Sequence, residues 1–327
     1  MKDSPKTMVK VIATGGTIAN TRAGRISVQQ VLEDIRKNYP ETVDILDGMR
    51  IEFLDLIRVG SEVFTSKEFL DIARAVNREI RGPQVTGIIV TQGTVTTEET
   101  AYFLHLLVRS DKPVVVTNSQ RPHGSVGNDG DKNLLDAIAV VLSPEAIGKG
   151  ALVVSNQTIN CGREVIKTSS RPGAFVSGEH GILGIIENDR VTFYRSPARR
   201  HTASSEFDID RITDLPKVEV ISAYYDADSG LIDAAFHLGV QGIVVNGLTA
   251  RGTPHAAQRE AFEKLAKEGM PIVLTTRGGV NNRVSTKRRD PFISGDNLPA
   301  HKARILLQLA LTMTSDLRDI QRIFNEY

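Results

Sequence analysis

The sequence predicts an α/β fold with two α/β domains, of which the N-terminal one is larger. Short apolar runs such as 88–90 alternate with stretches of helical spacing, as expected for βαβ units of a mostly parallel sheet with flanking helices. Glycine-bearing turns follow several of these runs. The alternation stops after Asn156 and returns at Val218, which predicts a second, smaller parallel α/β domain.

In the first part of the chain, apolar runs predict strands and amphipathic stretches predict helices. The clearest helix is 66–80, where Phe69, Leu70, Ala73 and Val76 share one face. Thr96 and Glu99 have capping-box spacing, which predicts a helix start near Thr97. The other expected helices are 28–38 and 134–142, and the expected strands are 9–13, 50–56, 88–90, 114–117 and 151–155.

After Asn156 the pattern changes twice. Residues 160–195 alternate over short spans between glycines, which indicates hairpins, and the polar residues 196–214 are interpreted as a linker. The predicted domains are therefore 1–195 and 215–327. In the second, the expected strands are 218–222, 242–245 and 272–274, and the expected helices are 231–238, 256–267 and 301–311.

Composition excludes several classes of protein. Lys plus Arg is 40 and Asp plus Glu is 39, so the basic surplus of a nucleic-acid binder is missing. The single cysteine, Cys161, allows no internal disulfide, and we expect it to be a buried core thiol. The carboxylates do not cluster at ligand spacing, so we expect neither a metal nor a cofactor.

The sequence also bears on location. No apolar run approaches the length of a membrane span, and the N-terminus has no signal-like apolar core. We therefore expect a cytoplasmic protein without a membrane partner, although an export signal could have been removed.

Three hydroxyl residues, Thr17, Ser61 and Thr94, stand at glycine-flanked turns after predicted strands. The carboxyl ends of parallel strands meet at one edge of a sheet, where ligands bind. A threonine nucleophile needs a base, and the seven histidines show no informative spacing. Lys167 could be that base if burial lowers its pKa, although a single lysine is more often a solvated charge. The residues alone thus predict a cleft with several hydroxyls but no particular reaction.

Two segments carry a family resemblance. VIATGGTIA at 11–19 and GIIVTQGTVTTEETAYFL at 87–104 resemble the two signatures of bacterial L-asparaginases and glutaminase-asparaginases. Further similar segments are KPVVVTNSQRP (112–122), GREVIKT (162–168), SPARRHT (196–202), LPKV (215–218) and KARILLQLALT (302–312). The resemblance implies a small-molecule substrate, no cofactor, and a homotetramer built as a dimer of dimers. Each C-terminal domain would complete a neighbour's active site.

The resemblance also implies roles for individual residues. Thr17 matches the nucleophilic threonine, and Thr94 and Lys167 match the threonine and lysine of a second catalytic group. Ser61 matches the serine that binds the substrate's α-carboxylate. The remaining matches are pocket-lining positions, namely Gly16, Gly93 and Ser119. In this chemistry the threonine attacks an amide, and water then releases an acid and ammonia.

Three positions of the pocket depart from the family pattern. The aspartate that normally follows the second threonine, and grips the substrate's α-ammonium, is Val95. The histidine before the glycine is Gln92, and the pocket glutamine after the serine is Glu62. Since valine cannot pair with a cation, the usual α-ammonium site is missing its main carboxylate.

The lid and the C-terminal segments depart as well. The lid normally contains a tyrosine, but none occurs between Thr17 and Tyr39, where Arg22 and Arg25 stand instead. The segments that match the site-lending regions of the family are 246–255 and 281–292. The second is basic, with Arg283, Lys287, Arg288 and Arg289.

These departures predict an amide hydrolase whose substrate lacks the α-ammonium group. The substrate could be a carboxylate or a cyclic or N-substituted amide, with L-asparagine excluded as the physiological one. Two alternatives stay open at this point. One is a lyase or isomerase in which Lys167 or Glu62 is the base, and the other is a non-catalytic relative that binds a metabolite.

Overall fold

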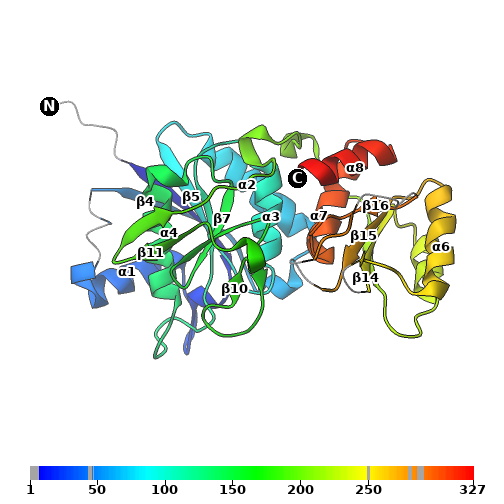
Figure 1. Cartoon of the computed structure of the whole chain (residues 1–327). Coiled ribbons are helices and arrows are strands. Elements are labelled where there is room, and N and C mark those ends of the chain that lie inside the picture. The colour runs from blue at the N-terminus through cyan, green and yellow to red at the C-terminus, as the bar shows by residue number, and fades with distance from the viewer. Residues whose placement is uncertain (1–6, 43–45, 47, 249–250, 279–281, 286–290) are drawn as a thin grey trace. The chain divides into compact units, whose positions relative to one another are not determined.

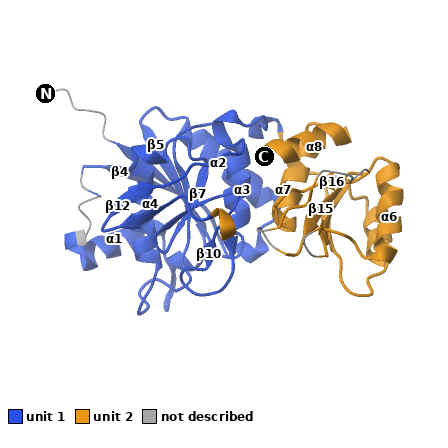
Figure 2. Ribbon diagram, in the orientation of Figure 1, with its two compact units in different colours: residues 1–177, 181–211 blue, residues 178–180, 212–327 orange. Residues whose placement is uncertain are grey.

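The computed structural model describes residues 7–42, 46, 48–248, 251–278, 282–285 and 291–327. The chain divides into two compact units, coloured separately in Figure 2. The first holds the residues up to Ser177 together with Gly181–Arg211, and the second holds Gly178–His180 with Ile212–Tyr327. The division falls within the predicted linker 196–214, which forms two 3₁₀ helices at Thr202–Ser204 and Ile209–Arg211.

The first unit is built on an eight-stranded sheet with the order β12-β11-β8-β7-β6-β5-β1-β4 (Figure 1). Neighbouring strands from β4 to β7 are parallel, whereas β8, β11 and β12 are antiparallel. Its strands are β1 (Met8–Gly15), β4 (Arg50–Val59), β5 (Val85–Thr91), β6 (Val114–Thr117), β7 (Ala151–Ser155), β8 (Thr158–Cys161), β11 (Gly184–Glu187) and β12 (Arg190–Phe193).

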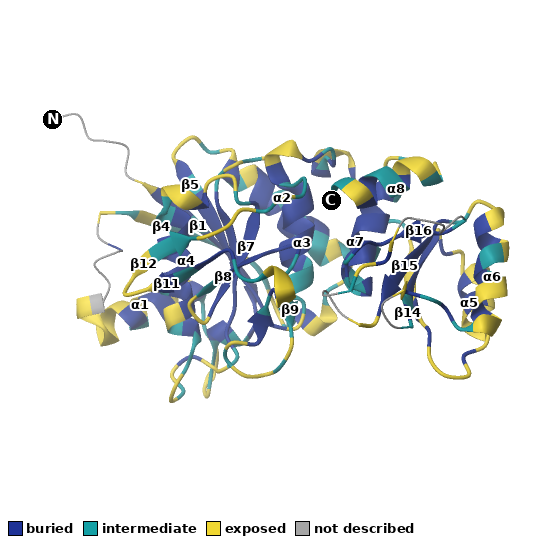
Figure 3. Cartoon of the chain, in the orientation of Figure 1, coloured by how far each residue is buried: buried dark blue, intermediate teal, exposed yellow. Residues whose placement is uncertain are grey.

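Helices and two small hairpins complete this unit. The helices are α1 (Val28–Asn38), α2 (Ser66–Ile80), α3 (Thr97–Leu107) and α4 (Gly130–Leu142). One hairpin pairs β2 (Asn20–Thr21) with β3 (Gly24–Arg25), and the other pairs β9 (Ile166–Lys167) with β10 (Phe175–Val176). Because β6 and β7 are buried along their whole length, their side chains on both faces form the core between sheet and helices (Figure 3).

The second unit has a four-stranded parallel sheet with the order β13-β14-β15-β16. Its strands are β13 (Val218–Ser222), β14 (Gly242–Gly247), β15 (Ile272–Thr276) and β16 (Ile293–Ser294). Its helices are α5 (Gly230–His237), α6 (Ala256–Lys267), α7 (Ala300–Leu311) and α8 (Leu317–Glu326). No helix among the described residues is both long and apolar enough to span a membrane.

The predicted fold of two α/β domains is confirmed, with local differences. Residues 20–27, where the sequence predicted no strand, contain the β2–β3 hairpin. Helix α4 begins at Gly130 rather than at residue 134, and α8 and β16 were not predicted. Helix α3 starts at the predicted Thr97, but the Thr96 side chain makes no capping hydrogen bond.

Candidate active site

The candidate site lies at the carboxyl ends of four adjacent strands. Thr17 follows β1, Ser61 follows β4, Thr94 follows β5 and Ser119 follows β6. These strands are neighbours in the sheet, in the order β6-β5-β1-β4. The parallel topology therefore brings all four hydroxyl residues to one edge of the sheet.

The turns that carry Thr17 and Thr94 pack directly on each other. Gly16 has φ of 89°, and a Cβ added to it would overlap the backbone nitrogen of Gly93. A side chain at Gly16 would push the two turns apart, and a Cβ on Gly93 would lie 2.7 Å from Ser61 Oγ, so both positions require glycine. Thr17 is partly exposed in a 3₁₀ helix (Thr17–Ala19), and its hydroxyl has no hydrogen-bond partner among the described residues. That hydroxyl is thus accessible to a ligand.

Lys167 lies beside Thr94. Its Nζ donates a hydrogen bond of 2.6 Å to Thr94 Oγ1, although the two residues are far apart in the sequence. Partial burial lowers the pKa of the Lys167 ammonium, and the negative charge of Glu98 opposes that shift. Lys167 is therefore a partly buried amine in contact with a hydroxyl, as a proton acceptor requires.

Glu98 is a site residue that the sequence reasoning missed. It lies in the first turn of α3, and it is the carboxylate whose charge acts on Lys167. Its position within the second signature was a signal that could have identified it. The aspartate that follows the Thr94 position in the family is absent here, and Glu98 is a carboxylate whose charge raises the pKa of Lys167.

Ser61 is buried, and its hydroxyl donates a hydrogen bond of 3.0 Å to the carbonyl oxygen of Gly93. Thr97 Oγ1 donates to the same carbonyl at 3.0 Å. A hydroxyl has only one proton to donate, so a substrate carboxylate would have to take the Ser61 proton away from Gly93. The two donors meanwhile hold the turn before Thr94 in place.

Gln92 explains the missing cap of α3. Its buried side-chain amide donates hydrogen bonds of 2.8 Å to both Thr96 Oγ1 and Thr100 Oγ1. The Thr96 hydroxyl is therefore engaged by Gln92 and does not cap the helix. At the position of the family histidine, this glutamine joins the end of β5 to the first turns of α3.

Val95 and Glu62 lie at the open side of the site. The Val95 side chain is 55% exposed, although it directly follows the buried Thr94. Glu62 is exposed, and its carboxylate folds back over the Cα of Gly60. Neither residue contacts Lys167 through a hydrogen bond in the described part of the chain, so Glu62 does not take the place of the missing aspartate there.

Arg25 fixes the shortened lid hairpin. Its guanidinium donates to the side chain of Asn20 at 2.9 Å and to the carbonyl oxygen of Arg58 at the end of β4 at 2.5 Å. A Cβ added to Gly15 would lie 3.2 Å from Arg25 Nη1, so the cation stands close to the glycine turn. Arg22 is exposed at the tip of the hairpin.

Ser119 is held by an aspartate that the sequence reasoning also missed. The Ser119 hydroxyl donates to the carbonyl oxygen of Arg121 and lies 3.3 Å from the Asp129 carboxylate, which accepts hydrogen bonds of 3.0 Å from the backbone nitrogens of Gln120 and Arg121. Ser119 also packs on Gly130, which contacts Ile18 beside Thr17. The segment after β6 is thereby attached to the start of α4.

In the second unit, only part of the basic segment is described. Arg283 forms an ion pair with Asp296, and its side chain is 71% exposed. Lys287, Arg288 and Arg289 lie outside the described residues, as do residues 249 and 250 of the other site-lending segment. Within the described chain, no group of three His, Cys, Asp or Glu side chains has the arrangement of a metal site. Cys161 is buried as expected.

Comparison with known proteins decides the family. Residues 8–199 match the family model "Asparaginase, N-terminal", and residues 217–324 match "Glutaminase/Asparaginase C-terminal domain". The chain belongs to the asparaginase family. The family resemblance of the two signatures is thus confirmed, and the chain is an asparaginase-family amidohydrolase.

Several relatives are similar over nearly their whole length. L-asparaginase 2 of Bacillus subtilis is 38% identical, covering 100% of this chain and 88% of that protein. The glutaminase-asparaginase of Acinetobacter glutaminasificans is 35% identical, covering 98% and 100%. The crystal structure of a probable cytoplasmic L-asparaginase from Campylobacter jejuni superimposes with a TM-score of 0.90 at 36% identity, covering 98% and 100% of the two chains.

Proposed function

We propose that this protein hydrolyses a small amide that lacks an α-ammonium group, with Thr17 as the nucleophile. The proposal rests on the contrast between two adjacent residues, Thr94 and Val95. Thr94 is hydrogen-bonded to Lys167, as the chemistry requires, whereas the next residue is the exposed, uncharged Val95.

The accessible hydroxyl of Thr17 supports its role as nucleophile. Its oxygen would attack the amide carbonyl carbon, and the C–N bond would then break. The hydroxyl proton would pass to the leaving nitrogen, so ammonia departs and an acyl ester remains on Thr17. Water would hydrolyse that ester to the acid and restore the threonine.

Lys167 and Thr94 would handle the protons of these steps. Burial lowers the pKa of Lys167, which increases the fraction of neutral amine near neutral pH. A neutral amine 2.6 Å from the Thr94 hydroxyl can accept its proton, and Thr94 can in turn take one from Thr17 or from water. Glu98 would stabilise the resulting lysine cation.

Val95 supports the substrate assignment. A substrate ammonium at this position would find no carboxylate, because Val95 is uncharged and the family aspartate is absent. Arg25, which stands close to the glycine turn, adds a cationic group that favours a carboxylate. The monoamide of a dicarboxylic acid without an amino group has the carboxylate and lacks the ammonium.

We further infer that the site is completed by another subunit in a homotetramer built as a dimer of dimers. The match of both domains to the asparaginase family models supports this, because the family resemblance implies such an assembly. Sedimentation velocity at several protein concentrations tests it, with a tetramer expected and a monomer contradicting it.

The cytoplasmic location stays a prediction. The name of the Campylobacter jejuni relative says cytoplasmic, whereas a 34% identical Haemophilus influenzae relative is called a probable periplasmic L-asparaginase. Fractionation of the source cells tests it. Family membership favours hydrolysis over the lyase, isomerase and binding alternatives.

Ammonia release combined with rapid-quench mass spectrometry tests the proposed function. With succinamate or glutaramate, we expect ammonia and a transient acyl mass on the tryptic peptide that contains Thr17. A product with a new double bond and no acyl mass would support a lyase instead. Unchanged amide would contradict the proposal for these substrates.

A further inference from the structure

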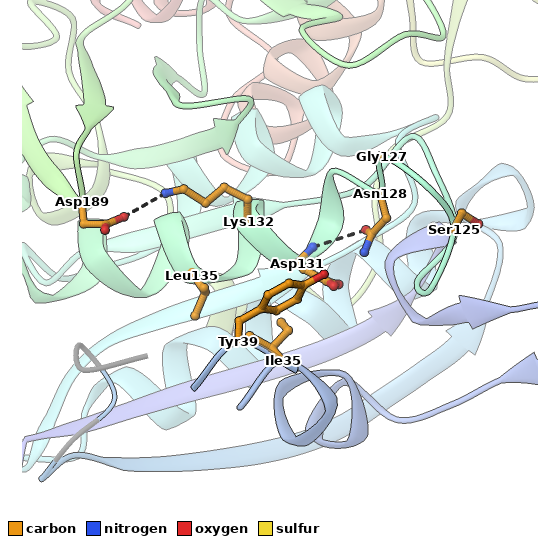
Figure 4. Close-up of a pocket in the computed structure, with 9 residues that line it drawn as sticks. All are labelled: Ile35, Tyr39, Ser125, Gly127, Asn128, Asp131, Lys132, Leu135 and Asp189. Atoms are coloured by element: carbon orange, nitrogen blue, oxygen red, sulfur yellow. Dashed lines mark hydrogen bonds and ion pairs between the residues drawn. The ribbon is translucent and has the colours of Figure 1, made fainter. Parts of the chain in front are cut away.

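A pocket outside the candidate active site lies between α1 and α4. Its volume is about 390 Å³, within the range of roughly 300–1,000 Å³ typical of small-molecule sites. The loop between β6 and α4 and the turn between β11 and β12 close its sides, through Asn128 and Asp189 (Figure 4). All of its lining residues belong to the first unit.

One wall of the pocket is apolar. Ile35 of α1 and Leu135 of α4 stand on either side of the Tyr39 ring (Figure 4). Tyr39 directly follows α1 and is 51% exposed, so its ring offers a large apolar surface that the fold leaves uncovered. An aromatic or branched apolar group would gain from packing here.

The lining of the pocket is also acidic. Asp131 and Asp189 line it, and the only lining cation among the described residues, Lys132, already contacts Asp189 at 3.2 Å and forms an ion pair with Asp136. Behind Asp131, the buried His123 ring lies 2.8 Å from that carboxylate and 3.2 Å from Asp34. Carboxylates thus outnumber cations, and the pocket favours a positively charged ligand.

The pocket is also joined to the loop that carries Ser119. Asn128 lines the pocket, and its side-chain oxygen accepts a hydrogen bond of 2.8 Å from the backbone nitrogen of Gly130. The next residue, Asp129, holds the backbone nitrogens of Gln120 and Arg121. A ligand that fixes Asn128 would therefore reduce local opening of the Asp129 contacts.

We propose that this pocket binds a small organic cation, an ammonium group carried on an aromatic or branched apolar body, and that binding stiffens the loop 118–130. The carboxylates of Asp131 and Asp189 attract the ammonium, and the apolar body packs on Tyr39, Ile35 and Leu135. This site goes beyond the hydrolytic function, because it uses none of the residues assigned to catalysis.

Calorimetric titration of the full chain with 2-phenylethylammonium tests the proposal. We expect a dissociation constant of about 1 mM, as for a weak ligand of this size. Uncharged 2-phenylethanol should bind about tenfold more weakly, and the anion 3-phenylpropionate should not bind. Equal binding of amine and alcohol, or no binding of the amine at about 10 mM, would overturn the proposal.

Substitutions of the lining residues test whether the amine binds in this pocket. Tyr39→Ala should weaken binding of the amine about tenfold, whereas Tyr39→Phe should retain it. Asp189→Asn should weaken it several-fold without disturbing the turn, since Asp189 has φ of 59° and asparagine tolerates that conformation. Glu219→Gln removes an exposed carboxylate from the second unit and should change nothing. Unchanged binding in both Tyr39→Ala and Asp189→Asn would refute this location.

Hydrogen exchange tests the link to the loop. With saturating 2-phenylethylammonium, the amides of Gln120 and Arg121 should exchange several-fold more slowly, while amides of α6 should exchange at the same rate. Binding without any change at Gln120 and Arg121 would contradict the stiffening of the loop.

Discussion

The two sides of the candidate site differ in how firmly the fold holds them. On the catalytic side, Thr94 is 8% exposed, Ser61 is 2% exposed, and hydrogen bonds join them to Lys167 and Gly93. On the recognition side, Val95 is 55% exposed. A change in recognition can thus occur without disturbing the packed turns, whereas a change in the catalytic residues cannot.

The largest effect is expected at Thr17. Thr17→Ala removes the nucleophile and should lower kcat for amide hydrolysis by at least about a thousandfold. Thr17→Ser keeps a hydroxyl and should retain more activity. Because Thr17 is partly exposed, both variants should unfold at nearly the wild-type temperature. Substantial hydrolysis by Thr17→Ala would place the nucleophile elsewhere.

The second largest effect is expected at Lys167. Lys167→Met keeps the length of the side chain but removes the amine, and should lower kcat by about 10²- to 10⁴-fold. Lys67→Met is a matched control, because Lys67 is an exposed lysine paired with Asp71 on α2. Steady-state kinetics that gave similar values for the two variants would show that the Lys167 contact with Thr94 is structural only.

Val95 tests the recognition side by itself. Val95→Asp restores a carboxylate at an exposed position, so it should raise kcat/KM for L-asparagine by about tenfold or more at little cost in stability. Val95→Asn, which has the same shape without the charge, should give no such gain. If both variants improved L-asparagine turnover equally, charge would not be the discriminating factor.

The smallest effect is expected at Glu98. Activity that depends on neutral Lys167 rises as pH increases through the pKa of Lys167. The Glu98 carboxylate raises that pKa, so Glu98→Gln should move the acid limb of the kcat profile to lower pH. A shift to higher pH would contradict the assigned role of Glu98.

The sequence predicted most of the architecture because its periodicity is strong. The helices 28–38, 66–80 and 256–267 and the strands 114–117, 151–155 and 218–222 were predicted to the residue. Predictions from local sequence patterns failed where a residue distant from the pattern contacts the same side chain. Thr96 has a capping-box partner in the sequence, but the buried Gln92 engages its hydroxyl instead.

The site was predicted less completely. The hydroxyl residues at glycine-flanked turns identified the edge of the sheet where the site lies. The family resemblance identified Lys167, which is distant from Thr94 in the sequence but hydrogen-bonded to it in the fold. Glu98 and Asp129 were missed because their roles depend on distances that spacing does not encode. Glu98 acts on a lysine of β9, and Asp129 holds backbone groups that precede it by eight or nine residues.

The most direct test of the central claim compares two substrates of the wild-type protein. Succinamate has the carboxylate and amide of L-asparagine but lacks the α-ammonium group. We predict that kcat/KM for succinamate exceeds that for L-asparagine by at least about tenfold, because Val95 offers no partner for an ammonium. An equal or higher kcat/KM for L-asparagine would contradict the account.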